Sequence, residues 1–109
     1  MTAGKELPLA GLRILELGEG LAGGFGSTIL ADFGAEVIKI ESPHKGDILR
    51  ELPPFYKNKS LWWVVDGRNK KSITVDLSSR EGQEIIKRLA AVSDVVLESF
   101  RPNILESFN

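Results

Sequence analysis

The sequence predicts an α/β fold, and two observations lead to this prediction. Residues 12–17 alternate apolar and polar side chains as a strand does, and they run directly into a cluster of glycines at 18–26. A helical stretch and a second strand-like segment, 36–40, complete the pattern within about thirty residues. A strand, a helix and a strand in that span form a βαβ unit, whose crossover is right-handed and whose strands run parallel.

The first helix is expected over residues 22–33. Its apolar side chains recur at spacings of three and four residues and so form one face of the helix: Ala22, Phe25, Ile29, Leu30 and Phe33. Gly34 follows directly and suits the left-handed backbone with which helices often end. The pattern therefore predicts an amphipathic helix between the two strands.

Residues 42–60 are rich in proline and glycine and show little periodicity. A long irregular stretch in a compact domain usually covers a site or another subunit. Segments 61–65 and 72–76 are then predicted as short extended pieces around a polar turn. The single histidine, His44, lies in the irregular stretch and is not nominated as a functional residue.

The second half of the chain continues the alternation of helices and strands. Ser78 and Glu81 have the spacing of a capping box, which opens a helix whose apolar residues recur up to Val92. A strand at 94–97 follows, and Pro102 suits the first turn of a short final helix. Parallel sheets need helical cover on both faces, and the last helix has barely begun where the sequence ends, so we expect a parallel sheet with flanking helices, truncated from a larger domain.

Composition excludes several classes of protein. The 109 residues fit one small domain, and a formal net charge of -1 offers no positive field, so no nucleic-acid partner is expected. Without cysteine there is no disulfide, thiolate metal site or cysteine nucleophile, which suits a cytoplasmic protein. No metal site is expected. No signal peptide or run of about 18 apolar residues is seen, so no membrane association is expected.

Gly18, Gly20 and Gly23 match the G-x-G-x-x-G pattern in the context it requires, after a strand and at the start of a helix. In a dinucleotide-binding fold, the helix amino terminus favours an anion, and an acidic residue such as Glu41 binds the ribose. Residues 15–20 also resemble the first motif of S-adenosylmethionine methyltransferases. Alternatively, the glycines only make the turn and let the helix pack closely. The motif alone leaves these alternatives open.

The remainder of the chain resembles a different group, the family III (CaiB/BaiF-type) CoA-transferases. The resemblance lies in the segments PLAGLRILEL at 8–17, LAG at 21–23, LADFGAEVIKIE at 30–41, RNKKSITVDL at 68–77 and DVVLESFRP at 94–102. These segments follow the order and spacing of the family and cover nearly the whole chain. The family usually has other residues at Gly24, Ser99, Asn103 and near Ser107, with glycine at the position of Asn103.

The resemblance implies that residues 1–109 form the amino-terminal, Rossmann-like CoA-binding segment of a larger enzyme, in a homodimer whose chains interlock. It also implies contacts between coenzyme A and the residues Leu21, Ala22, Val75, Asp76, Leu77, Ser78, Ser99, Phe100 and Arg101. Lys70 and Lys71 lie in the densest positive stretch and are expected to help hold the phosphate groups.

The activity implied by the resemblance is transfer of CoA between an acyl-CoA thioester and a carboxylic acid, with no permanently bound cofactor. In the family a catalytic aspartate lies beyond this segment, so no catalytic residue is expected here and the chain alone is expected to be inactive. An acyl-CoA racemase of the same superfamily remains an alternative. A methyltransferase or NAD-binding Rossmann module is an alternative from a different class, but it accounts only for the glycine turn and Glu41.

Overall fold

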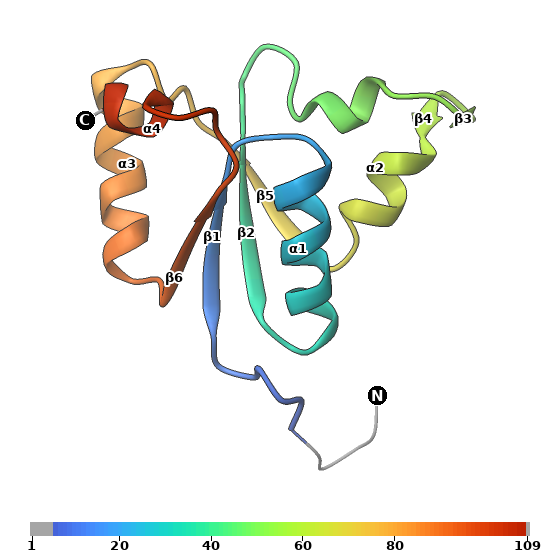
Figure 1. Ribbon diagram of the computed structural model, residues 1–109, viewed down its shortest axis with the longest axis horizontal. Helices are drawn as coiled ribbons and strands as arrows, with labels where there is room; N and C mark the ends of the chain where they lie inside the picture. The colour runs from blue at the N-terminus through green and yellow to red at the C-terminus, as the bar shows by residue number, and fades with distance from the viewer. Residues whose placement is uncertain (1–5, 109) are drawn as a thin grey trace.

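The computed structural model describes residues 6–108, which form a parallel sheet with helices on both faces (Figure 1). The elements are β1 (Arg13–Leu17), α1 (Leu21–Asp32), β2 (Glu36–Glu41), the 3-10 helix η1 (Ile48–Glu51), β3 (Phe55–Tyr56), β4 (Lys59–Ser60), α2 (Leu61–Asp66), β5 (Lys70–Thr74), α3 (Arg80–Ala91), β6 (Val95–Glu98) and α4 (Ile104–Ser107). The prediction of a Rossmann-like α/β fold is thereby confirmed.

The main sheet has the strand order β5-β2-β1-β6, and every neighbouring pair in it is parallel. The chain first moves outward from β1 through β2 to β5, and then returns through α3 to place β6 on the other side of β1. Strand order therefore reverses between β1 and β6. In open α/β sheets, ligands bind beyond the carboxyl ends of the strands at such a switch point.

Two small cores lie on opposite faces of the sheet. On one face, Ile14 and Val37 pack with Ala31 of α1 and with Ala35. On the other face, a second set packs under α3 and α4: Leu15, Leu17, Ile38, Ile40, Ile73, Ile86, Leu89 and Leu105. The alternation of side chains along β1 and β2 produces this division, because successive residues of a strand point to opposite faces.

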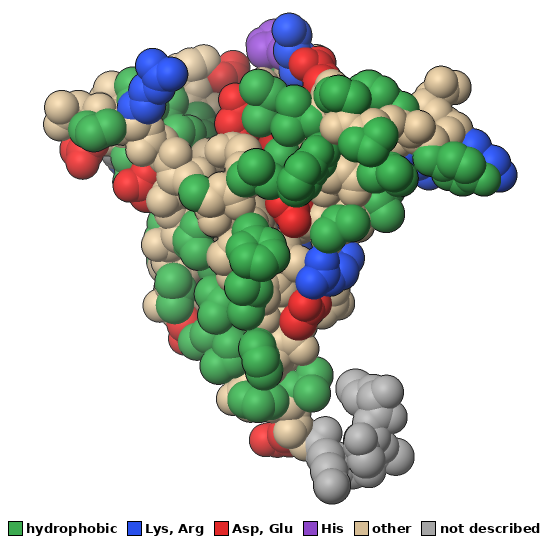
Figure 2. All heavy atoms as spheres, turned by 45° about the vertical axis from the view of Figure 1, so that its right-hand side comes forward, with side chains coloured by type: hydrophobic (Ala, Val, Ile, Leu, Met, Phe, Trp, Pro, Cys, Tyr) green, Lys and Arg blue, Asp and Glu red, His purple; other side chains and the backbone are tan. Residues whose placement is uncertain are grey.

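Helix α1 presents its smallest side chains to the sheet. The buried residues are Gly23, Gly24, Ser27, Thr28 and Ala31, while the predicted apolar face is largely turned outward. Leu21, Phe25, Ile29 and Phe33 are 46%, 54%, 40% and 52% exposed, and Figure 2 shows hydrophobic side chains gathered on this side of the molecule. Spacing alone located an apolar face correctly but could not tell which face the sheet would cover.

Residues 61–65 are helical in α2, so the prediction of an extended segment was wrong. Ser60 begins the helix, because its side-chain oxygen accepts a hydrogen bond from the Trp63 amide at 3.4 Å. The aromatic and β-branched residues of this segment favour strands on propensity. Packing of α2 against α1 and η1 outweighs that preference.

Three other boundaries differ slightly from the predictions. The cap of α3 is Ser79, whose oxygen accepts from the Gly82 amide at 2.9 Å, whereas Ser78 donates to Asp76 Oδ1 at 2.6 Å. Strand β5 begins at Lys70 rather than at Ser72. Helix α4 is capped by Asn103, after Pro102, with φ at 68°. Asparagine tolerates this left-handed conformation better than most residues, which fits the usual glycine of the similar family.

None of the helices formed by residues 6–108 is long and apolar enough to cross a membrane.

Enlarging the buried face of α1 should destabilise the fold. Ala31 is fully buried between α1 and the sheet, so we expect Ala31→Leu to lower the free energy of unfolding by about 1–3 kcal/mol through overpacking. Ile29→Leu, on the exposed side of the same helix, should change it by less than about 0.5 kcal/mol. Urea denaturation of both variants checks this, and equal effects would contradict the orientation of α1.

Candidate functional site

A groove of about 390 Å³ lies beyond the carboxyl ends of the strands. Each of the four strands of the main sheet contributes to it at or just after the carboxyl end of the strand, and Phe108, directly after α4, adds to the lining. The lining residues are Gly18, Glu19, Ile40, Glu41, Ser42, Pro43, His44, Asp47, Val75, Asp76, Leu77, Ser78, Phe100 and Phe108. The groove therefore occupies the place where this type of sheet binds its ligands.

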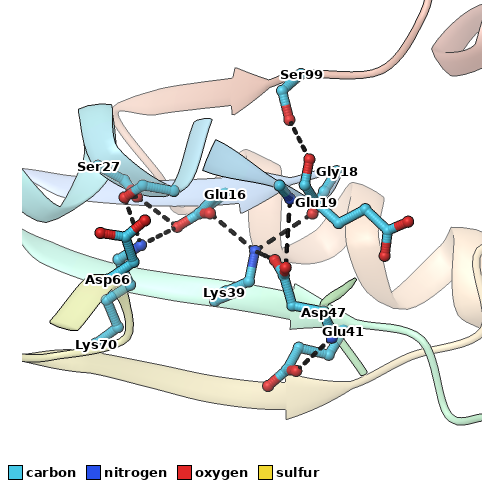
Figure 3. Close-up of polar contacts among 12 residues, drawn as sticks. Glu16, Gly18, Glu19, Ser27, Lys39, Glu41, Asp47, Asp66, Lys70 and Ser99 are labelled. Carbon is cyan, nitrogen blue, oxygen red and sulfur yellow. Dashed lines mark hydrogen bonds and ion pairs between the residues drawn. The ribbon is translucent and has the colours of Figure 1, made fainter. Parts of the chain in front are cut away.

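The glycine turn, residues 18–20, forms one wall of the groove and leads into α1. Gly18 and Gly20 both have left-handed backbones, with φ of 92° and 98°. A Cβ atom on Gly18 would lie 2.6 Å from Ser99 Oγ, and one on Gly23 would lie 2.9 Å from the same oxygen. The glycines thus allow the segment after β6 to pack directly against the turn (Figure 3).

A group of charged side chains, the buried ionic cluster, lies beneath this turn between α1 and the sheet (Figure 3). It consists of Glu16, Lys39, Asp47, Asp66 and Lys70. Lys39 Nζ is 2.8 Å from Glu16 Oε2 and 2.6 Å from Asp47 Oδ2, and all three side chains are at most 1% exposed. Lys70 Nζ lies 3.0 Å from the other oxygen of Glu16. The polar face of α1 is complementary to this cluster, since Ser27 Oγ donates to Glu16 Oε1 at 2.5 Å.

Two members of the ionic cluster, Lys39 and Asp66, have raised pKa values, for different reasons. Burial alone would lower the pKa of Lys39, but the Glu16 charge and hydrogen bonds to Asp47 and Glu16 outweigh it and raise the pKa. Desolvation raises the pKa of Asp66, against the opposing influence of Lys70. Asp66 Oδ2 is buried and finds no hydrogen-bond partner within residues 6–108. Lys39 is therefore held as a cation, and the Asp66 carboxyl binds its proton more tightly than an ordinary aspartate does.

Glu41 is the acidic residue that the dinucleotide hypothesis requires, but its carboxylate already accepts hydrogen bonds from other groups of the protein. One carboxylate oxygen accepts from Arg50 Nε at 2.7 Å and from the Asp47 amide at 2.8 Å. The other accepts from Arg50 Nη2 at 2.8 Å and from the Ser72 hydroxyl. Burial would raise the pKa of Glu41, but these donors lower it to about 2. Both oxygens are thus already bonded at the position where a ribose would need them.

The segments that the family resemblance associates with coenzyme A converge on one end of the sheet. Val75, Asp76, Leu77, Ser78 and Phe100 line the groove. Leu21 and Ala22 are exposed at the start of α1, Ser99 Oγ donates to the Glu19 carbonyl at 3.4 Å, and Arg101 is exposed after β6. Residues separated by about eighty positions in the chain therefore meet around the glycine turn.

Lys70 and Lys71 do not reach the groove. The Lys70 side chain is 3% exposed and belongs to the ionic cluster, where its ammonium group also donates to the Gly24 carbonyl at 2.9 Å. Lys71 pairs with Glu36, the first residue of β2, so it lies toward the amino ends of the strands, away from the groove. The dense run of positive residues did not reveal where each side chain lies, because neighbouring residues of a strand point to opposite faces.

Sequence reasoning missed several residues that shape the site, above all Glu16, Lys39 and Asp47. A signal for the first two was present, because charged residues inside short apolar strands of a parallel sheet must be buried and therefore paired. His44, which was not nominated, lies in the groove wall. Across residues 6–108, no group of histidine, aspartate and glutamate side chains has an arrangement that could hold a metal ion.

Comparison with known proteins identifies the family of the chain. The model of CoA-transferase family III matches residues 9–109. The chain is 57% identical over 102 residues to a succinyl-CoA–D-citramalate CoA-transferase of Chloroflexus aurantiacus, covering 93% of the chain and 25% of that protein. It is 46% identical to the human succinyl-CoA:glutarate CoA-transferase, covering 92% of the chain and 23% of that protein.

A solved structure has the same fold. The crystal structure of a CaiB/BaiF family protein from Brucella suis superimposes with a TM-score of 0.86 at 38% identity, covering 95% of this chain and 29% of that one. The chain thus spans about a quarter of the length of the curated relatives it matches.

The lowered pKa of Glu41 makes the free energy of unfolding depend on pH. Because the folded pKa is near 2 and the ordinary value is 4.5, the ionised carboxylate stabilises the fold above pH 4.5, and this contribution is lost as the pH falls toward 2. Its size is on the order of 2 kcal/mol, less than the full shift implies because Arg50 is partly exposed.

Glu41→Gln should therefore lower the free energy of unfolding at pH 7 by this amount and by clearly less at pH 3. Urea denaturation at the two pH values measures the difference, with Glu84→Gln on the exposed side of α3 as the control. An equal loss at both pH values would show that the Glu41 charge is not what stabilises this site.

Proposed function

The chain belongs to CoA-transferase family III, and we propose that it forms the CoA-binding portion of an enzyme that transfers CoA between an acyl-CoA thioester and a carboxylic acid. The observation that supports this proposal best is that residues 75–78 and Phe100 line one groove at the carboxyl ends of the strands, next to the glycine turn that leads into Leu21 and Ala22 and that Ser99 contacts. These are the segments that family resemblance associates with CoA.

The chemistry of the groove suits the uncharged parts of CoA. Its floor is apolar, built from Ile40, Val75, Leu77, Phe100 and Phe108, and can bury a flat base or the pantetheine chain. Acidic side chains at its rim can accept hydrogen bonds from hydroxyl or amino groups. Since neither lysine nor arginine is among the described residues that line the groove, we propose that the phosphates lie outside it, near the amino terminus of α1.

In the proposed reaction, an aspartate carboxylate of the longer protein attacks the acyl carbon of the thioester and releases the CoA thiolate, which leaves a mixed anhydride. The thiolate then attacks the aspartyl carbonyl, releasing the donor acid and forming an enzyme thioester. The acceptor carboxylate attacks the thioester carbonyl and releases the CoA thiolate, which leaves a second mixed anhydride. The thiolate then attacks the acyl carbon of the acceptor, which forms the new acyl-CoA and frees the aspartate carboxylate. Residues 1–109 would hold CoA so that each step is positioned, and alone they should show no transfer.

Two alternatives differ in what they leave unexplained. An acyl-CoA racemase would use the same groove, and is distinguished by turnover without a carboxylate acceptor. A methyltransferase or NAD-binding module would need a free acidic group after β2, but both oxygens of Glu41 are already bonded within the protein. This contact favours the CoA proposal over a dinucleotide site.

We also propose that a second copy of the protein covers the apolar face of α1. Leu21, Phe25, Ile29 and Phe33 form a line of exposed side chains at spacings of four residues. Such contiguous apolar faces on a protein surface commonly mark contacts between proteins. Segment 42–60 contains η1 and β4, which pack against α2, and this segment would contribute to the interface of a homodimer.

Blocking the groove should abolish CoA binding. Ser78 is exposed and lines the groove, so we expect Ser78→Trp to weaken CoA binding by the intact protein about tenfold or more. Ala91→Trp, at the exposed end of α3, is the matched control. Calorimetric titration with CoA, NAD and S-adenosylmethionine in parallel measures both, and selective binding of NAD or S-adenosylmethionine would overturn the proposed function.

Charging the apolar face of α1 should break the proposed dimer. Phe25 is 54% exposed, so Phe25→Asp should leave the fold intact but raise the dimer dissociation constant by at least about tenfold. Ile85→Asp places the same charge at an exposed apolar position of α3, which is 46% exposed. Sedimentation velocity of the intact protein compares the two, and an unchanged dimer in Phe25→Asp would rule out this face as the interface.

A further inference from the structure

We propose that Asp47 is a positioning residue, whose buried carboxylate fixes the glycine turn against the loop after β2 and so sets the shape of the groove. The inference rests on the proposed function, because it concerns how the same groove is made ready for CoA. Asp47 lies in the groove wall, but its side chain is fully buried beneath it. It therefore acts through the backbone around it.

The two carboxylate oxygens of Asp47 have different partners. Oδ2 lies 2.6 Å from Lys39 Nζ. Oδ1 accepts hydrogen bonds from the Leu49 amide at 2.9 Å and from the Gly20 amide at 3.3 Å. One carboxylate thus joins the start of η1, the central strand β2 and the last residue of the glycine turn.

Lys39 holds the other end of the same turn. Its ammonium group donates to the Gly18 carbonyl at 3.3 Å and pairs with Glu16 Oε2 at 2.8 Å. The turn is therefore fixed at both ends, at the Gly18 carbonyl by Lys39 and at the Gly20 amide by Asp47. Glycine has the widest choice of backbone conformation, and a Cβ on Gly20 would meet no atom within 4 Å. Ser99 packs against the Gly18 end of the turn, whereas at Gly20 the contact with Asp47 holds the backbone where side-chain packing does not.

Asp47 links two walls of the groove through its carboxylate and its backbone amide. Gly18 and Glu19 form one wall, and residues 42–44 form another. The Asp47 amide donates to Glu41 Oε1 at 2.8 Å, which closes the loop 42–47 at its base. Asp47 therefore ties this loop to the glycine turn, and a change in its charge should alter the distance between the walls.

The buried Lys39–Asp47 pair positions the backbone of the glycine turn rather than adding stability. Removing an ammonium and a carboxylate from water costs about as much as their attraction returns, so an apolar pair of similar volume is often equally stable. An ion pair, however, also offers directed hydrogen bonds to the Gly18 carbonyl and the Gly20 amide. Leucine and methionine could fill the space but could not make these bonds.

Three variants of the intact protein test this inference. Asp47→Asn keeps an oxygen that can accept the Leu49 and Gly20 amides but loses the charge. Lys39→Met/Asp47→Leu replaces the ion pair by apolar side chains and leaves Glu16 paired with Lys70. Asp32→Asn removes a carboxylate from the exposed pair with Arg68 and serves as the control.

We expect the double variant to keep its unfolding midpoint but to bind CoA at least about tenfold more weakly, with faster amide exchange at Gly20 before any ligand is added. Asp47→Asn should show a smaller effect in the same direction, and Asp32→Asn should show none. Wild-type affinity and exchange in a folded double variant would overturn the inference. If the unaltered protein fails to bind CoA, the proposed function fails, and the exchange measurement at Gly20 alone decides whether Asp47 positions the turn.

Discussion

The ammonium group of Lys39 lies between the carboxylates of Glu16 and Asp47 on the face of the sheet that α1 covers. Glu16 and Lys39 occupy strand positions that a parallel sheet normally gives to apolar residues. Helix α1 provides polar partners: Ser27 donates to Glu16, and the Gly24 carbonyl accepts from Lys70, the second cation paired with Glu16. The helix therefore turns its small and polar side toward the sheet and leaves its aromatic residues outside. The internal ion pairs thus determine which face of α1 is exposed.

The groove follows from strand order together with this cluster. Reversal of the chain between β1 and β6 brings the glycine turn next to Ser99, and the approach is close enough to require glycine at positions 18 and 23. Residues after β2 and β5 add the remaining walls. Because Asp47 bonds to the turn and to the loop after β2, the cluster beneath the groove and the groove above it form one unit.

The sequence was sufficient for the fold class and for most elements. It failed where tertiary contacts outweigh local patterns. Residues 61–65 have strand-like composition but become helical, because Ser60 caps them and they pack on α1. Lys70 resembled a phosphate ligand, but it pairs with Glu16 in the interior. Neither Asp47 nor its contact with Gly20 could be predicted, because the two residues meet only after the sheet has formed.

Amide hydrogen exchange of the intact protein, with and without CoA, tests the central claim most directly. If the groove holds CoA, the ligand should slow exchange together in residues 18–22, 75–78 and 99–101, and it should leave the start of β5 around Lys71 unchanged. Protection spread over these separate segments would show that they form one site. Protection confined to other regions, or its absence in a protein that binds CoA, would contradict the assignment of the groove.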